Sequence, residues 1–330
     1  MLILTKSVLA MMISFLISVM MGIIVIPFLK KIHASQRLSI YLEQAHSSKK
    51  NTPTMGGLIF ILSSLFIYLI FFLLGKIRMN YTILIIIITM IGYALIGFLD
   101  DYLIIKRNNN KGLSEYNKIV FQLVIAVIFF YIFSIAGNEP LLWIHTLGIK
   151  QNIGGFYGLF ILFVLLASSN AVNLTDGLDG LAAGLSVISF LTFGIISYNT
   201  GWLEGYEDLA IFSFILVGSL LGFLVFNISP AKVFMGDTGS LSLGATLGAY
   251  AIVTRHEILL IVIGIVFVIE TLSVILQRYY YKLTHKRLFL MAPIHHSFEK
   301  RGWNERDIVK LFWIIGLLGA MISILFGVWY

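Results

Sequence analysis

Long apolar runs separated by short polar connections dominate the pattern along this chain. Ten runs reach or approach the roughly 20 mostly apolar residues that a helix needs to cross a bilayer. They cover residues 7–28, 56–74, 81–99, 119–136, 153–171, 180–198, 209–226, 240–253, 258–279 and 310–330. We therefore predict an all-α integral membrane protein with about ten transmembrane helices, folded as a single domain over residues 1–330.

Two of these runs need a closer look. The run at 240–253 is short, and its Gly244-Ala-Thr-Leu-Gly248 stretch is rich in small residues. Small residues let helices approach closely, so we expect this span inside the bundle. The run at 7–28 follows Lys6, has spanning length and lacks a small-residue cleavage site. It is predicted to be the first span rather than a removed signal peptide.

The composition agrees with a membrane protein. Hydrophobic residues make up 59% of the 330 positions and charged residues 12%, whereas soluble domains carry about 25% charged residues. The chain has no cysteine, which excludes disulfides, thiol catalysis and a thiolate metal site. The net charge of +7 does not indicate a nucleic-acid partner, because the basic residues segregate by membrane side.

The distribution of Lys and Arg predicts the orientation. The connections after the first, third, fifth, seventh and ninth runs, counted with the adjoining run ends, hold 18 of the 23 basic residues. By the positive-inside rule these connections face the cytoplasm. Both termini then lie on the non-cytoplasmic side, in agreement with an even number of spans. We predict a multi-pass membrane protein with this orientation.

The polar motifs fall almost entirely on the predicted cytoplasmic side, which indicates an active site there. One motif, Ser168–Gly184, lies between two apolar runs and holds two carboxylates, two amides and three glycines, Gly184 included. If this stretch is helical, Asn173, Asp176 and Asp179 share one face. Its glycines permit a turn and the close approach of a ligand. The alternative is an ordinary turn with a capped helix start.

Two further motifs carry carboxylates. Asp100 and Asp101 end the third run; they repel each other and lose hydration there, so they favour a bound cation, or one becomes a proton acceptor. The alternative is a pair of interfacial stop charges. Asp237 lies in Gly-Asp-Thr-Gly-Ser at the start of the eighth run, where helix N–H groups can also meet an anion. Its alternative is a plain N-cap.

The longest basic connection, 280–309, contains His295 and His296. Adjacent imidazoles can bind a transition metal, but the other candidate ligands are oxygens. Oxygen ligands favour Mg²⁺ held by one or two carboxylates and substrate phosphates, and the histidines then fit pyrophosphate binding. Glu270 is the only acid deep in an apolar run; a functional role and a structural hydrogen bond both fit it.

These motifs together resemble the phospho-N-acetylmuramoyl-pentapeptide-transferase family, within the polyprenyl-phosphate N-acetylhexosamine-1-phosphate transferase superfamily. The matching stretches are Asn51–Gly57, Asp100–Tyr102, Asn173–Gly180, Phe234–Ser240 and Met291–Glu299. The resemblance implies transfer of phospho-MurNAc-pentapeptide from its UDP conjugate to undecaprenyl phosphate, giving UMP and lipid I. It also implies ten spans, a cytoplasmic-face site and a homodimer. The family commonly has three consecutive histidines after Pro-Ile, whereas this chain has Ser297 in the third place.

From the motifs and the resemblance we predict the site residues. The catalytic set is Asp100, Asp101, Asp237 and His295, and the Mg²⁺ ligands are Asp237 and Asn173. The substrate-binding set is Lys50, Lys118, Asn173, Asp176, Gly177, Leu178, Asp179, Phe234, His295 and His296. Asp100 or Asp101 positions the acceptor phosphate or acts as its base; a covalent phospho-sugar intermediate on a carboxylate is the alternative.

Within the substrate-binding set, the Gly177-Leu178-Asp179 turn and Phe234 are assigned to uridine. The 280–309 connection is assigned to the muramoyl-pentapeptide part of the donor.

Other functions remain as alternatives. A relative that transfers GlcNAc-1-phosphate is one, although Met291–His296 looks like the muramoyl branch. A transporter or lipid flippase is a more distant one. Transporters place charged groups near the bilayer midplane and often show repeated halves, whereas the acids here lie at loop edges on one side.

Overall fold

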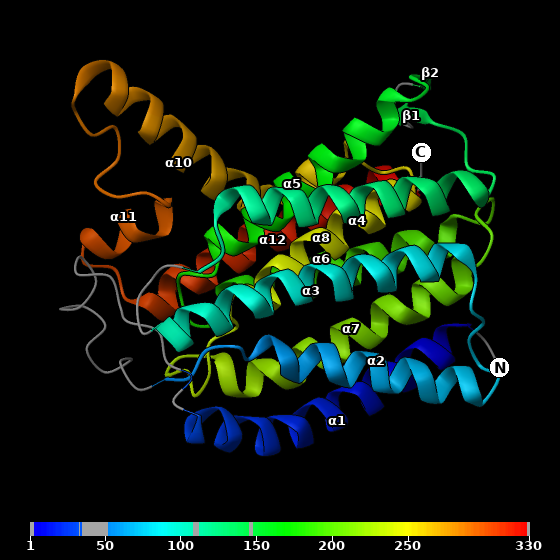
Figure 1. The fold of residues 1–330 in the computed structure, drawn as a ribbon, viewed down its shortest axis with the longest axis horizontal. Coiled ribbons are helices and arrows are strands. Elements are labelled where there is room, and N and C mark those ends of the chain that lie inside the picture. The colour runs from blue at the N-terminus through cyan, green and yellow to red at the C-terminus, as the bar shows by residue number, and fades with distance from the viewer. Residues whose placement is uncertain (1–2, 33, 35–51, 108–111, 145–147, 329–330) are drawn as a thin grey trace.

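The computed structural model describes residues 3–32, 34, 52–107, 112–144 and 148–328, and it is built almost entirely of helices (Figure 1). The helices are α1 (Ile3–Lys31), α2 (Gly57–Leu73), α3 (Tyr81–Arg107), α4 (Glu115–Ile135), α5 (Phe156–Thr175), α6 (Leu181–Asn199), α7 (Tyr206–Asn227), α8 (Gly236–Val253), α9 (Leu260–Ile263), α10 (Ile265–Thr284), α11 (Ile294–Lys300) and α12 (Glu305–Val328). The predicted all-α membrane class is confirmed. Within the described ranges, seven helices are long and apolar enough to cross a membrane: α1, α3, α4, α5, α6, α7 and α12.

Each predicted apolar run coincides with a helix, with two departures from the prediction. The ninth run is broken at Gly264, which separates the short α9 from α10. Between α4 and α5 the chain forms an antiparallel hairpin of β1 (Leu141–Ile144) and β2 (Ile149–Asn152). The hairpin lies in a connection that carries no long apolar run, so the hydropathy pattern gave no signal for it.

The centre of the bundle is formed by α7 and α8, and every residue of α8 from Thr238 to Val253 is buried. Small residues allow this. A Cβ added at Gly244 would lie 2.3 Å from the carbonyl oxygen of Ser168 on α5, and one at Gly248 would lie 2.5 Å from the Ser168 hydroxyl. The backbones of α5 and α8 therefore lie too close together for larger side chains, and the predicted inner position of this span is confirmed.

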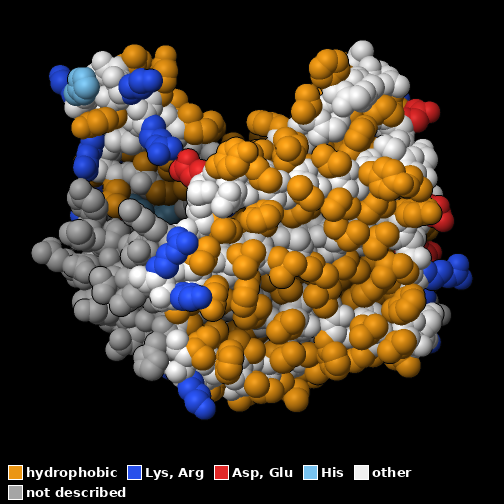
Figure 2. Space-filling view, viewed as in Figure 1, with side chains coloured by type: hydrophobic (Ala, Val, Ile, Leu, Met, Phe, Trp, Pro, Cys, Tyr) orange, Lys and Arg blue, Asp and Glu red, His pale blue; other side chains and the backbone are white. Residues whose placement is uncertain are grey.

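The two ends of the bundle differ in character. In Figure 1 the N- and C-terminal ends lie at the same end of the bundle as the β hairpin. The C-terminal ends of α3 and α5, the N-terminal ends of α4, α8 and α12, and the α10–α11 segment gather at the opposite end. Figure 2 shows hydrophobic side chains over most of the flank between the two ends. The predicted site motifs therefore meet at one end of an apolar bundle.

Candidate active site

A lysine between two carboxylates forms the centre of this end. Lys118, at the start of α4, places its Nζ 3.0 Å from Asp100 Oδ2 and 3.2 Å from Asp237 Oδ2. Asp100 comes from the end of α3 and also accepts a hydrogen bond from the backbone N–H of Leu113 at 2.6 Å. The end of α3, the start of α4 and the distant start of α8 thus bring two carboxylates and one ammonium group together. The arrangement can bind a phosphate with its lysine and a cation with its carboxylates.

Asp101 faces a different partner from its neighbour Asp100. It is fully buried and accepts hydrogen bonds from the N–H of Thr238 at 3.0 Å, the hydroxyl of Thr238 at 2.7 Å and the N–H of Asp237 at 3.3 Å. The N-cap residue of α8 is Met235, whose side chain makes no capping bond. Asp101 therefore satisfies the free N–H groups at the start of α8 from the neighbouring helix. Of the two predicted bases, these contacts leave Asp100 the better placed.

Asp101→Ala is expected to lower the free energy of unfolding by about 1–3 kcal/mol, because it leaves buried donors of α8 without an acceptor. Asp100→Ala, next to it, removes a carboxylate from the Lys118 pair but leaves the α8 start capped. Thermal unfolding in detergent should therefore separate the two variants, with the larger loss for Asp101→Ala. Equal melting temperatures for Asp101→Ala and the parent protein would contradict the capping role.

The amide of Asn173 links α5 to this cluster. Its Nδ2 donates to Asp237 Oδ1 at 2.8 Å and to the Ser240 hydroxyl at 2.9 Å. Asp176 follows at the end of α5. Desolvation by the surrounding protein, and then repulsion from the carboxylates of Asp237, Asp101 and Asp179, raise the pKa of Asp176 well above its ordinary value. Among the residues described at this end, the carboxylates outnumber Lys118, the lysine paired with them, so a further cation would be stabilised there.

The turn between α5 and α6 is held by side chains from two other segments. Asp179 donates its backbone N–H to Glu305 Oε1 on α12 at 2.8 Å, and its own Oδ2 accepts from the N–H of Ala231 at 3.0 Å. Asn227 accepts from the N–H of Gly180 at 3.1 Å and donates to the carbonyl of Val233 at 3.0 Å. The turn is thus fixed against the α7–α8 connection before any ligand arrives.

The histidines of α11 pack against the same turn. His295 is fully buried, with its Nδ1 3.1 Å from Glu270 Oε2 on α10. A Cβ added at Gly177 would lie only 2.3 Å from His295 Nε2. His296 Nδ1 lies 2.5 Å from Glu299 Oε2. His295 therefore connects Glu270 on α10 to Gly177 in the α5–α6 turn.

Ser297 has a structural role where the family commonly has a third histidine. Its hydroxyl donates to the carbonyl of Met291 at 2.5 Å and accepts from the N–H of Met291 at 3.0 Å. These two bonds close the loop that leads into α11. Ser297 thereby fixes the chain on which His295 and His296 stand.

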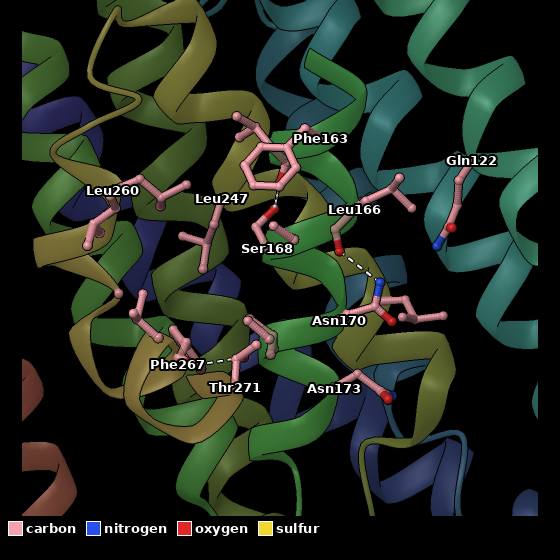
Figure 3. A pocket seen from close by; sticks show the side chains of 18 of the residues that line it. Gln122, Phe163, Leu166, Ser168, Asn170, Asn173, Leu247, Leu260, Phe267 and Thr271 are labelled. Carbon is pink, nitrogen blue, oxygen red and sulfur yellow. Dashed lines mark hydrogen bonds between the residues drawn. The ribbon is translucent and has the colours of Figure 1, made fainter. Parts of the chain in front are cut away.

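An apolar groove of about 930 Å³ leads away from the charged cluster. Lys118 and Asp237 line one end, and Glu257 and Ile258 lie among the residues that line it elsewhere, from the α8–α9 connection. Figure 3 shows Asn173 in the same view as the apolar side chains of α5, α8, α9 and α10. The labelled apolar residues of this lining are Phe163, Leu166, Leu247, Leu260 and Phe267. The groove has the character needed to hold a hydrocarbon chain beside a site for charged groups.

Most of the predicted residues gather at this end of the molecule. Asp100, Lys118, Asn173 and Asp237 form one connected cluster, while the Gly177–Asp179 turn and the histidines form a second group in contact with each other. Phe234 is half-buried, and its backbone bonds to Pro53 and Gly56; its stacking on uracil stays a prediction. Lys50 lies outside the described residues.

Two residues of this end were not predicted, and a third was left open. Glu305 and Asn227 hold the α5–α6 turn. They had no signal in the sequence beyond an acid at a helix start and an amide at a helix end. The sequence fitted both a functional and a structural role for Glu270. The structure shows that its carboxylate contacts His295.

Comparison with known proteins defines the class of this site. Residues 83–255 match the model of glycosyl transferase family 4, and residues 49–61 match the phospho-N-acetylmuramoyl-pentapeptide-transferase signature 1. The chain is thus a membrane enzyme of the glycosyl transferase family 4 class.

The particular family follows from full-length relatives, each a phospho-N-acetylmuramoyl-pentapeptide-transferase. The proteins of Oceanobacillus iheyensis and Geobacillus thermodenitrificans are 44% and 45% identical, over 97% and 98% of this chain and 98% of each relative. That of Listeria monocytogenes serotype 4b is 46% identical over 94% of this chain and 95% of its own length. This chain belongs to the phospho-N-acetylmuramoyl-pentapeptide-transferase family.

Proposed function

We propose that this protein transfers phospho-MurNAc-pentapeptide from UDP-MurNAc-pentapeptide to undecaprenyl phosphate, giving lipid I and UMP for peptidoglycan synthesis. The observation that carries the proposal is the Asp100–Lys118–Asp237 cluster at the end of an apolar groove, in a chain of this family. The groove suits a polyprenyl chain, and the cluster suits the two phosphorylated groups that must meet.

The acceptor lies with its hydrocarbon chain in the groove and its phosphate near Lys118. An oxygen of that phosphate forms a bond to the sugar-bearing phosphorus of the donor, and the bond from this phosphorus to the bridging oxygen of UMP breaks. UMP leaves with the bridging oxygen. Lys118 offsets the charge of the phosphates, and Asp100 holds Lys118 in place at 3.0 Å. A covalent intermediate on a carboxylate remains the alternative route.

The residues present fit a magnesium ion that takes most of its ligands from substrate. The candidate ligands are the carboxylate of Asp237 and the side-chain amide of Asn173. In the described ranges, no group of three or more His, Asp or Glu side chains is arranged to hold a metal by itself. Mg²⁺ is often bound by one or two carboxylates and substrate phosphates. Asp237 would hold it with Asn173, and the ion would neutralise charge on the pyrophosphate. Asp176 would be an outer partner.

We assign the sugar-nucleotide donor to the α5–α6 turn and the histidines of α11. The Gly177-Leu178-Asp179 turn meets the uridine, with Phe234 flanking the base. His295 and His296 are assigned to the pyrophosphate, and Lys50, which lies outside the described residues, is assigned to substrate binding. We assign the hydrogen bond from the uracil N–H to the carboxylate of Asp179, whose Oδ2 also accepts from the N–H of Ala231.

A transfer assay tests this function. Purified protein with radiolabelled UDP-MurNAc-pentapeptide, undecaprenyl phosphate and Mg²⁺ should form a lipid-linked product and UMP in equal amounts. UDP-GlcNAc in place of the muramoyl donor should give little product. Equal or faster transfer from UDP-GlcNAc would move the chain to the GlcNAc-1-phosphate relatives.

We also propose ten spans, with the site on the cytoplasmic side of the bacterial inner membrane and a homodimer as the assembly. Support comes from the ten apolar runs and from the basic residues of the predicted cytoplasmic connections.

The orientation is tested with single cysteines, because the chain has none of its own. Lys232→Cys and Asn304→Cys, at the site end, should be shielded from an impermeant thiol reagent in intact cells. Glu139→Cys and Gly201→Cys, in the connections at the opposite end, should be labelled. Labelling of the first pair from outside would reverse the orientation.

A further inference from the structure

The second half of α10 leaves the bundle. In Figure 1 this helix runs outward from the other helices, and the chain returns through α11. Val266, Phe267, Glu270 and Ser273, in its first half, are buried. Residues 281–288, in contrast, are all exposed. Within the part of the chain that the structure describes, nothing covers this outer portion, which we name the α10 tip (residues 275–290).

The α10 tip has one apolar stripe and one basic stripe. Ile275, Tyr279 and Leu283 follow one another at four-residue intervals and are 54%, 65% and 64% exposed. Four-residue steps place them on one face of the helix. Arg278 and Lys282 form a second line at the same interval, and both are exposed. An exposed apolar face bordered by Lys and Arg is typical of a helix at a membrane interface.

The charge of this region has one sign only. From Thr271 to Phe298 the sequence contains no Asp or Glu. Directly after the helix, Lys286 and Arg287 add two exposed basic residues, and Arg287 donates only to the carbonyl of Leu290, at 3.3 Å. Among the described residues, no ion pair includes a basic residue of the tip. Its charge is available for an anionic surface.

The α10 tip keeps its shape by its own bonds. Gln277 accepts hydrogen bonds from the N–H groups of Leu288 and Phe289, at 3.1 and 2.8 Å. These bonds fold the chain after the helix back along it. The apolar and basic groups are therefore presented in a fixed arrangement, without the ordering cost that a flexible loop would have on binding.

We propose that the α10 tip docks on the acidic phospholipids of the cytoplasmic leaflet. Its apolar stripe enters the acyl region, and Arg278, Lys282, Lys286 and Arg287 reach the headgroup phosphates, as long basic side chains do at an interface. Each basic residue near an anionic membrane contributes roughly a five-fold increase in affinity. The partner is thus a lipid surface, recognised by its negative charge.

Docking of the α10 tip also affects the groove. This part of the inference rests on the proposed function. Thr271, Leu272 and Ile275 of α10 line the groove opposite α5, and Figure 2 shows a hollow beside this outer segment. A docked tip holds this wall away from α5 and keeps the groove open to the bilayer. Acidic lipid should therefore lower the KM for polyprenyl phosphate and leave the KM for the sugar nucleotide unchanged.

The lipid preference itself is tested without any assay of transfer. Full-length Leu283→Cys protein, labelled with a fluorophore, is placed in nanodiscs that contain a nitroxide on the headgroup of either phosphatidylglycerol or phosphatidylcholine. At equal mole fraction, quenching by the phosphatidylglycerol probe should be at least about five-fold stronger, the contribution of a single basic residue. The difference should shrink at 1 M salt, where the Debye length is about 3 Å.

A matched pair of charge variants decides the assignment. Lys282→Gln/Lys286→Gln removes two of the four basic residues of the tip and should clearly weaken the preference. Lys300→Gln/Arg301→Gln removes two exposed charges from the same connection and should retain the full preference. Equal quenching in the unsubstituted background overturns the proposal, and so does the same loss in both double variants. Because the readout is lipid proximity, inactivity in the transfer assay would bear on the proposed function and not on docking.

Discussion

Asp237→Asn is expected to lower the turnover number by at least about 10²–10³-fold, the range seen when one group that stabilises charge in a transition state is removed. The substitution keeps the size and shape of the side chain. It removes the negative charge that lies 3.2 Å from Lys118 Nζ, and with it the carboxylate that we assign to magnesium. The remaining amide offers a weak ligand to a divalent cation.

The loss should not come from unfolding. The backbone N–H of Asp237 bonds to Asp101, and this contact does not depend on the Asp237 side chain. Lys118 retains Asp100 at 3.0 Å as a partner. We therefore expect a melting temperature close to that of the parent protein and a transfer rate near background. Radiolabelled transfer and thermal unfolding on the same preparation measure both.

Asp307→Asn is the control for this substitution. Asp307 lies on α12 and forms an exposed pair with Lys310 at 3.2 Å, and such pairs contribute little to stability. Its transfer rate should equal that of the parent protein. Full activity of Asp237→Asn at ordinary magnesium concentrations would remove Asp237 from the magnesium site.

Much of the fold could be predicted from the sequence because its main signal is one-dimensional. Apolar runs of spanning length specify helices, since a bilayer leaves few other ways to satisfy backbone hydrogen bonds. The break at Gly264 was missed, because the residues on both sides are as apolar as those of a continuous span. The outward course of α10 was missed for a related reason. Hydropathy reports the solvent that a residue prefers but not the helix that it packs against.

The candidate site could be predicted as a set of residues but not as a set of contacts. Asp100 and Asp101 are identical and adjacent in sequence, and only the packing of α3 against α8 gives one of them Lys118 and the other the start of α8. Glu270 and His295 are separated by a loop that brings α11 back to α10. Such pairings depend on how helices cross, which the spacing of residues does not specify.

The contact between Gly177 and His295 suggests the second large effect. Gly177→Ala would place a Cβ 2.3 Å from His295 Nε2, so the imidazole or the turn has to move. Overpacking of this kind costs about 1–3 kcal/mol, which corresponds to a factor of roughly 5–150. His295 has little room to yield, because it is fully buried and lies 3.1 Å from Glu270.

We expect Gly177→Ala to lower the transfer rate by about 10- to 100-fold, and the loss should depend on the imidazole. His295→Ala, which removes the imidazole, should lower the rate on its own by about 10²-fold, the lower range for a group that acts in catalysis. The double variant Gly177→Ala/His295→Ala should be no slower than His295→Ala alone, because the added methyl group then has space. Transfer rates of the four proteins give the coupling between the two positions.

Gly201→Ala, where nothing lies within 4 Å of the added Cβ, should have the parent rate. Additive losses in the double variant would show that Gly177 acts independently of His295, and the α10–His295–turn connection would then have no part in transfer.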